Sequence, residues 1–158
     1  MRLDELGSLR SLSALNEKAV LLRLLDRLDE ALVVANEAVR QARFTGDREQ
    51  LLGARVRRAQ VLQYQGKFDE AITELTGCVD EARAHDWTAL EAFAVQSRGK
   101  CHFDAKDYEN ALADVTAAVF LREKLGASKT DIESSLIAVA VVQSFVDRSK
   151  TAGDEPRA

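Results

Sequence analysis

Two cysteines and a neighbouring histidine are the residues of this chain whose types could hold a metal ion. Cys101 and His102 are adjacent, and Cys78 lies in the preceding predicted helix. Protein zinc sites usually draw on four ligands, commonly with a C-x-x-C or H-E-x-x-H spacing. Neither spacing occurs and no fourth ligand is evident. We therefore expect no metal, and two buried free thiols of the kind found in a reducing compartment.

Motifs for catalysis are equally sparse. Gly66-Lys67 lacks the upstream glycine and the following serine or threonine of a phosphate-binding loop, and no G-x-S-x-G motif or dinucleotide glycine run occurs. The carboxylate pairs Asp29-Glu30 and Asp69-Glu70 lie where helices are expected to begin, and there they favour the positive end of the helix dipole. We expect no catalytic residue and no cofactor. An enzyme or metal protein that uses Cys101 and His102 is the remote alternative.

The helices that position these residues follow an internal repeat. Three alanines mark it, at positions 31, 71 and 111, each in a similar short segment. A small residue follows seven positions after each alanine, and a basic residue with a small neighbour precedes each segment. The aligned groups are Leu28 to Leu32 with Ala38 and Lys18-Ala19, Phe68 to Ile72 with Cys78 and Arg58-Ala59, and Tyr108 to Leu112 with Ala118 and Arg98-Gly99. Three copies in register identify a repeat protein, in which small residues let helix backbones approach closely.

Each repeat predicts two helices joined by a short turn. In the second repeat the first helix is expected from about Asp47 to Gln65 and the second from about Phe68 to Ala84. The repeats are placed at about 12–46, 47–86 and 87–126. The predicted fold class is all-α: an α-solenoid of three helix-turn-helix repeats plus a C-terminal capping helix, about seven helices in all.

The end of the chain is expected to close this solenoid. Thr130 and Glu133 fit a capping box, which predicts a cap helix over residues 130–148. Residues 149–158 are polar and aperiodic, so we expect a disordered tail there. These boundaries leave one domain over residues 1–148.

Composition narrows the function classes. The chain has 158 residues and 1 proline, whereas average usage would give about 8. So few prolines argue against turn-rich β folds, because such folds need many turn-forming residues. The net charge of −4 makes nucleic acid an unlikely partner. No apolar stretch approaches the roughly 20 residues of a membrane span, and the first residues carry acid rather than a basic signal region. We expect a cytoplasmic protein with no membrane partner.

The repeat resembles the tetratricopeptide repeat (TPR) family, over roughly residues 12–148. The matching residues are Arg98-Gly99, Lys106 to Asp114 and Ala118 in repeat three, Ala59, Leu62, Gly66 to Ile72 and Cys78 in repeat two, and Ala19, Leu22, Leu28 to Leu32 and Ala38 in repeat one. Asp26 and Lys106 replace the turn glycine. The period is longer than the family's roughly 34 residues, so longer helices and a deeper groove are expected.

The resemblance implies a right-handed superhelix whose first helices line a concave groove that binds peptides or partner proteins. Amide side chains there can bond an extended backbone, arginine can take a carboxylate, and aromatic rings can anchor apolar groups. The implied function is a non-catalytic adaptor or scaffold that binds a protein or peptide, such as a short acidic or C-terminal segment. The alternative is a merely solvated polar surface. The groove residues are Asn16, Arg23, Arg57, Gln60, Gln63, Tyr64, Gln96, Lys100 and Phe103.

The cap helix raises a second possibility. Its apolar residues wrap around most of its circumference, whereas a solenoid cap should keep a polar outer face. A homo-oligomerisation or sensor module that uses this helix is therefore the alternative function. The candidate interface residues are Leu136, Val139, Val142, Phe145 and Val146.

Overall fold

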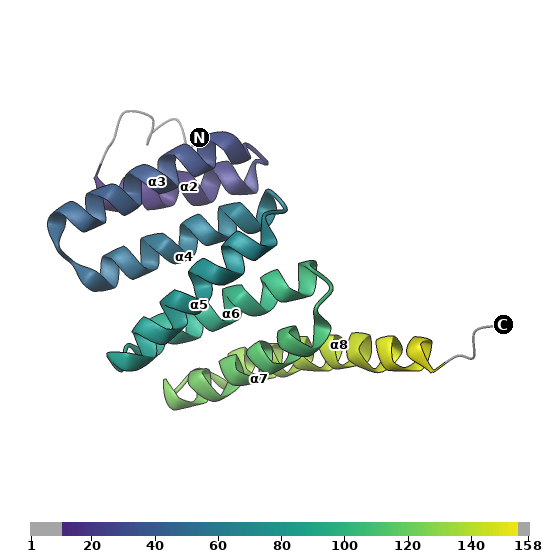
Figure 1. Cartoon of the computed structure of the whole chain (residues 1–158). Helices are drawn as coiled ribbons and strands as arrows, with labels where there is room; N and C mark the ends of the chain where they lie inside the picture. Colours follow the sequence, from purple (N-terminus) through teal and green to yellow (C-terminus); the bar gives the residue numbers. More distant parts are fainter. Residues whose placement is uncertain (1–10, 155–158) are drawn as a thin grey trace.

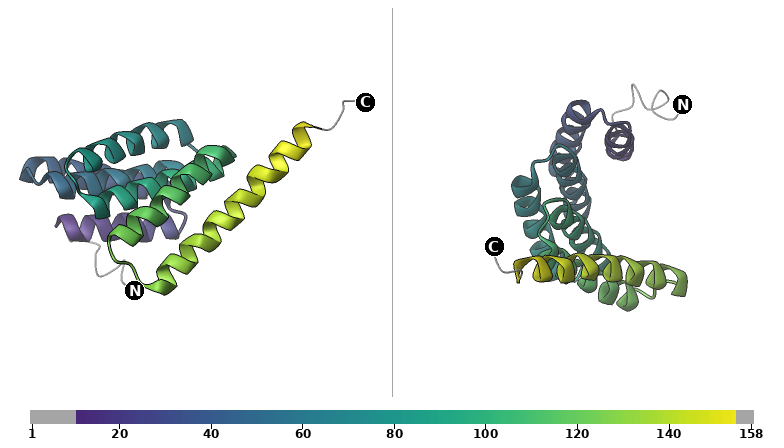
Figure 2. Two further views of the ribbon diagram at one scale, coloured as in Figure 1. Left: turned by 90° about the horizontal axis from the view of Figure 1, so that it is seen from below. Right: turned by 90° about the vertical axis from the view of Figure 1, so that its right-hand side faces the viewer.

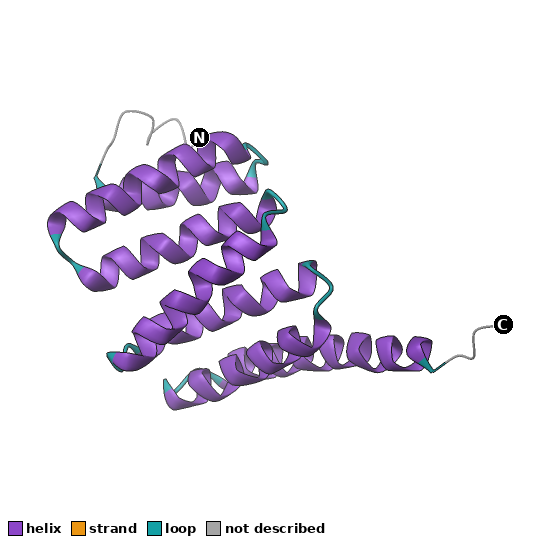
Figure 3. Ribbon diagram, viewed as in Figure 1, coloured by secondary structure: helices purple, strands orange, loops and turns teal. Residues whose placement is uncertain are grey.

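The computed structural model describes residues 11–154, and all regular structure in that range is α-helical (Figures 1 and 3). The N-terminal ten residues, for which an irregular or helical lead-in was expected, lie outside the described residues. The helices are α2 (Leu12–Leu24), α3 (Leu28–Thr45), α4 (Arg48–Tyr64), α5 (Phe68–Ala84), α6 (Thr88–Asp104), α7 (Tyr108–Lys124) and α8 (Lys129–Gly153). None of these seven helices is long and apolar enough to cross a membrane.

The helices stack in sequence order. Three helix-turn-helix pairs, α2 with α3, α4 with α5 and α6 with α7, are followed by the single helix α8, which packs on α7. The first helices also contact one another, α2 with α4 and α4 with α6. The stack is curved, as the right-hand view of Figure 2 shows. The predicted all-α solenoid of helix pairs plus a terminal helix is confirmed.

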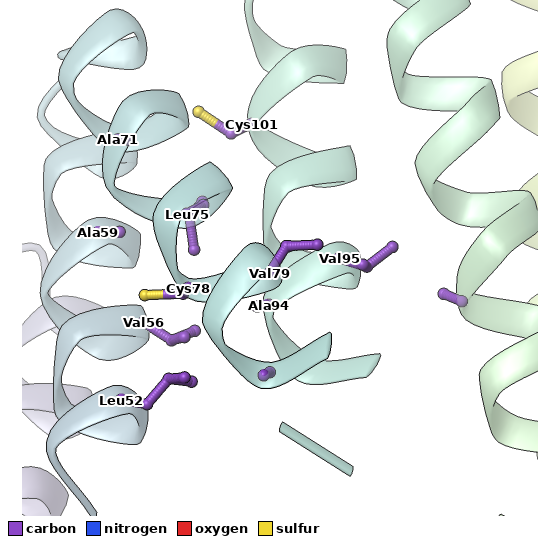
Figure 4. Close-up of a cluster of buried hydrophobic side chains, with 12 residues drawn as sticks. Leu52, Val56, Ala59, Ala71, Leu75, Cys78, Val79, Ala94, Val95 and Cys101 are labelled. Atoms are coloured by element: carbon purple, nitrogen blue, oxygen red, sulfur yellow. The ribbon is translucent and has the colours of Figure 1, made fainter. Parts of the chain in front are cut away.

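Small residues at fixed positions let the paired helices approach. Ala31, Ala71 and Ala111 are fully buried at the equivalent position of the three second helices. Gly99 of α6 faces α7 so closely that an added Cβ would lie 3.1 Å from the Cβ of Asp114. A larger side chain at any of these positions would force the helices apart. The largest cluster of buried residues joins α4, α5, α6 and α7 at the centre of the stack (Figure 4).

The turns repeat as regularly as the helices. Asp26, Gly66 and Lys106, each within a pair, have φ angles of 59°, 78° and 63°. The turns between pairs and the turn before α8 likewise place a left-handed residue at positions 46, 86 and 126. The replacement of the turn glycine by Asp26 in the first repeat and by Lys106 in the third therefore leaves the backbone conformation of the turn unchanged. Lys106 bears the steric cost of that conformation, because its Cβ crowds the backbone.

Lys106→Gly is expected to raise the free energy of unfolding by about 1 kcal/mol, because glycine adopts a positive φ without this cost. Urea denaturation followed by circular dichroism measures the change. Lys106→Ala is the matched control: it removes the same charge and keeps the Cβ, so no gain is expected. An equal gain from both variants would assign the effect to charge and contradict the backbone explanation.

The first residues of α4 and α8 show one sequence prediction that agrees with the structure and one that does not. Asp47, near which the first helix of repeat two was expected to begin, caps α4, its carboxylate accepting from the backbone N–H of Gln50 at 3.0 Å. The prediction of a capping box at Thr130 is wrong. The residue that caps α8 is Ser128, whose hydroxyl accepts from the backbone N–H of Asp131 at 3.2 Å. Helix α8 thus begins one residue earlier than predicted, because Ser128 lies in extended backbone and offers the better cap.

The far end of α8 also corrects a prediction. The helix does not end at Arg148 but continues through residues 149–153, which were expected to begin a disordered tail. Ser149 and Thr151 donate their hydroxyls to carbonyls of the preceding turn, so their polarity is compatible with a helix. No glycine or proline intervenes before Gly153. Residues 155–158 of the expected tail lie outside the described part of the chain.

Candidate functional site

Two pockets lie along the face formed by the first helices and α8. The larger, here called the α2–α4 pocket, has a volume of about 660 Å³ and also reaches Leu90 of α6. The smaller, the α6–α8 pocket, has about 290 Å³ and lies between α6, α7 and α8. Of the predicted groove residues, the α2–α4 pocket contains Asn16 and Arg57. The α6–α8 pocket contains Gln96, Lys100 and Phe103.

The α2–α4 pocket contains a cation without an acidic partner. Arg57 is partly buried and its guanidinium carbon lies 5.7 Å from the centre of the Phe93 ring. Burial lowers the pKa of Arg57, and no carboxylate among the described residues pairs with it. Glu17 and Glu49 also line this pocket, so an anionic group would have to bind at Arg57 itself, where pairing would restore the lost solvation.

The α6–α8 pocket is mainly apolar with a polar edge. Most of its wall is formed by Gly99, Phe103, Val115, Ala118, Ala138, Val141 and Val142. The polar edge is made by a hydrogen-bonded group in which Arg122 donates to the side-chain oxygens of Gln96 and Ser135. Lys100 is exposed at the same pocket and has no hydrogen bond or ion pair among the described residues. This pocket is shaped for an apolar side chain, and it offers a cation beside it.

Three of the predicted groove amides are already bonded within the chain. Gln60 of α4 donates to the Ser97 hydroxyl of α6 at 3.0 Å. Gln63 of α4 is buried and donates to Asp104 at 2.8 Å. Gln96 accepts from Arg122 as described above. These amides hold neighbouring repeats together, so Asn16 is the one predicted amide without a hydrogen bond among the described residues.

Arg23 and Tyr64 form a separate contact at the other end of the same face. The Arg23 guanidinium carbon lies 4.8 Å from the Tyr64 ring centre, and half of Tyr64 remains exposed. The buried Nε of Arg23 has no hydrogen-bond partner. The structure thus places this predicted pair on the surface and in mutual contact, which leaves the guanidinium able to bind a further acceptor.

The sequence did not lead us to Arg122 of α7, which reaches the α6–α8 pocket. It also did not lead us to an ion pair that occurs at equivalent positions of the second and third repeats. Arg58 pairs with Glu74 at 2.5 Å, and Arg98 pairs with Asp114 at 2.8 Å. Both members of the second pair lie 40 positions after those of the first, so the repeat alignment contained the signal. In the first repeat Val34 replaces the acid, and the pair is absent there.

The predicted oligomer residues of α8 divide into two groups. Val142 and Val146 are buried within the chain, and Phe145 packs against Phe103 and Tyr108 with ring centres 5.0 and 5.1 Å away. Val139 is partly buried, whereas Leu136 is half exposed. A second chain could reach Leu136 directly, but could reach Val142 or Val146 only if α8 left its place.

The thiols of Cys78 and Cys101 are buried and poorly reactive. Burial raises the pKa of Cys78 and of Cys101 to about 11, so the reactive thiolate is scarce at neutral pH. His102 lies 3.6 Å from Asp107 and 3.9 Å from Asp114. Residues 11–154 contain no group of three or more potential ligands placed to hold a metal ion.

Comparison with known proteins gives a fold and no family. No protein-family model and no curated protein matches the chain. Among solved structures, the crystal structure of BtubC (BKLC) from P. vanneervenii is similar, with a TM-score of 0.70 and 18% identity over 99% of this chain and 72% of that one. Likeness at this identity shows a shared fold, and it agrees with the stacked helix pairs described above. The chain is an all-α helical-repeat solenoid.

Proposed function

We propose that the chain is a TPR-type, non-catalytic interaction module that binds an extended peptide segment along the face of its first helices. Helical-repeat solenoids commonly use this extended concave surface for binding. The observation that carries the proposal is Arg57, a partly buried cation with no acidic partner that opens onto the α2–α4 pocket. An acidic side chain or a C-terminal carboxylate is the group that this arginine fits.

The two pockets together define a ligand pattern. Arg57 lies over Phe93, and Phe103 of the α6–α8 pocket is ten residues further along the same helix. Ten helical residues span about 15 Å, a distance that about four or five extended residues cover. The ligand is therefore a segment with an acidic group at one end and a bulky apolar side chain four or five residues away, beside Lys100.

The test is selection from a randomised peptide library, with the selected peptides then titrated against variants. Wild-type protein should enrich sequences with the acidic-to-apolar spacing given above. Arg57→Glu combined with Lys100→Glu should weaken their binding by at least about tenfold, because it replaces attraction by repulsion.

A matched control keeps the same change in net charge. Arg40→Glu with Lys67→Glu reverses two exposed cations that line neither pocket, and binding should stay within about twofold of wild type. Equal binding by the pocket variant and the control, or a selected set without an acidic residue, would reject the groove model.

A further inference from the structure

Helix α8 has an apolar face that nothing in the described chain covers. Leu136, Ile137 and Val141 are 50%, 66% and 48% exposed, and Ala140 between them is exposed as well. Their spacing of three and four residues places them on one side of the helix. Ser135, Val142 and Val146 are buried on the opposite side. These exposed residues form the outer α8 face, and the partly buried Ser144 lies on the same side one turn after Ala140.

Opposite charges flank this face at equal distances. Glu133 lies seven residues before Ala140, and Arg148 lies seven residues after Val141. Both are exposed, and each has only a weak contact within the chain. Glu133 is 3.9 Å from Lys129, and the Arg148 guanidinium lies 5.0 Å from the Phe145 ring centre. Such exposed contacts contribute little and leave both charges open to another partner.

A helix with this pattern is complementary to itself when it runs antiparallel. A two-fold axis between Ala140 and Val141 places Glu133 opposite Arg148 of the partner subunit, and the same pair forms again on the other side. In this register Ile137 faces Ser144 of the partner subunit, so a bulky residue meets a small one. The opposite, parallel arrangement would place Glu133 against Glu133 and Arg148 against Arg148.

We propose that the outer α8 face binds a second copy of this chain, forming an antiparallel α8–α8 dimer about an axis between Ala140 and Val141. The C-terminal half of α8 extends away from the other helices in the left-hand view of Figure 2, which leaves room for a second helix beside it. The interface uses Leu136 of the predicted set, but Ile137, Ala140 and Val141 replace the buried residues Val142 and Val146. It lies apart from Arg57 but shares Val141 with the α6–α8 pocket, so the dimer interface borders the proposed peptide site.

The first test is the mass of the intact chain in solution, measured by light scattering and sedimentation at micromolar concentrations. Wild-type protein should be a dimer, and Ile137→Asp should be a monomer with an unchanged circular dichroism spectrum. Val33→Asp is the matched control, because Val33 is equally exposed at 65% but lies on α3, and it should stay dimeric. A monomeric wild type, or equal loss of the dimer in both variants, overturns the proposal.

The second test fixes the orientation. Glu133→Arg alone and Arg148→Glu alone should each raise the dimer dissociation constant about tenfold, through two symmetric repulsive pairs, and the double variant should restore it. Ala140→Cys should form a disulfide-linked dimer under mild oxidation, while the buried Cys78 and Cys101 do not react. A dimer whose double variant is no better than the singles contradicts the antiparallel register, as does a cysteine that does not cross-link.

Discussion

Replacing Arg98 by alanine is expected to lower the free energy of unfolding by about 3 kcal/mol, since it strands a buried charge. Arg98 of α6 donates from two nitrogens to the two oxygens of Asp114 on α7, both at 2.8 Å. Only 8% of the Asp114 side chain is exposed, so water cannot replace the lost donors. The bond to Asp114 raises the pKa of Arg98 despite burial. Urea denaturation of Arg98→Ala measures the loss.

Two further variants separate the ion pair from general disruption. Arg98→Leu with Asp114→Leu removes both charges, so it should recover most of the stability that the single variant loses. Arg58→Ala should cost less, about 1 kcal/mol, because Glu74 keeps Arg55 at 3.2 Å. A loss from Arg98→Ala below that of Arg58→Ala would contradict the explanation.

The fold was predictable because the repeat carries its own register. The buried alanines at 31, 71 and 111 marked the second helices, and α4 and α5 begin and end within one residue of the predicted bounds. Even the turns without glycine follow the pattern, since Asp26 and Lys106 adopt the same left-handed conformation as Gly66. Local steric requirements of this kind recur at each repeat, so the sequence expresses them three times.

The site was less predictable because its polar partners come from neighbouring repeats. Position on a helix face indicated that Gln60 and Gln63 lie along the groove, but not that Ser97 and Asp104 would satisfy them. The same limit applied to α8. Apolar residues around most of the circumference of a helix indicate that one side is buried, but they do not indicate which side. The packing of Val142 and Val146 within the chain needed the three-dimensional structure.

Phe145→Ala is expected to release α8 while leaving the rest of the stack folded. Phe145 packs its ring against Phe103 of α6 and Tyr108 of α7, with centres 5.0 and 5.1 Å away, so one side chain joins three helices. Removing it costs about 3 kcal/mol of packing. In a solenoid each unit contacts only its neighbours, so the loss of a terminal unit need not spread. Hydrogen exchange of α8 amides should therefore accelerate about 100-fold, while amides of α4 and α5 keep their protection.

This local response distinguishes Phe145 from Arg98, which joins the two helices of the third pair and also contacts Thr76 of α5, and whose loss should weaken protection in α5 to α7 alike. Phe120→Ala is the control for removing a ring, because Phe120 is 67% exposed on α7 and should change exchange little. A uniform acceleration in all helices of Phe145→Ala would mean that the stack unfolds as one unit. Confined to α8, the acceleration would also predict weaker peptide binding, because Val141 and Val142 leave the α6–α8 pocket when α8 detaches. Groove and terminal helix would then be coupled through a single aromatic cluster.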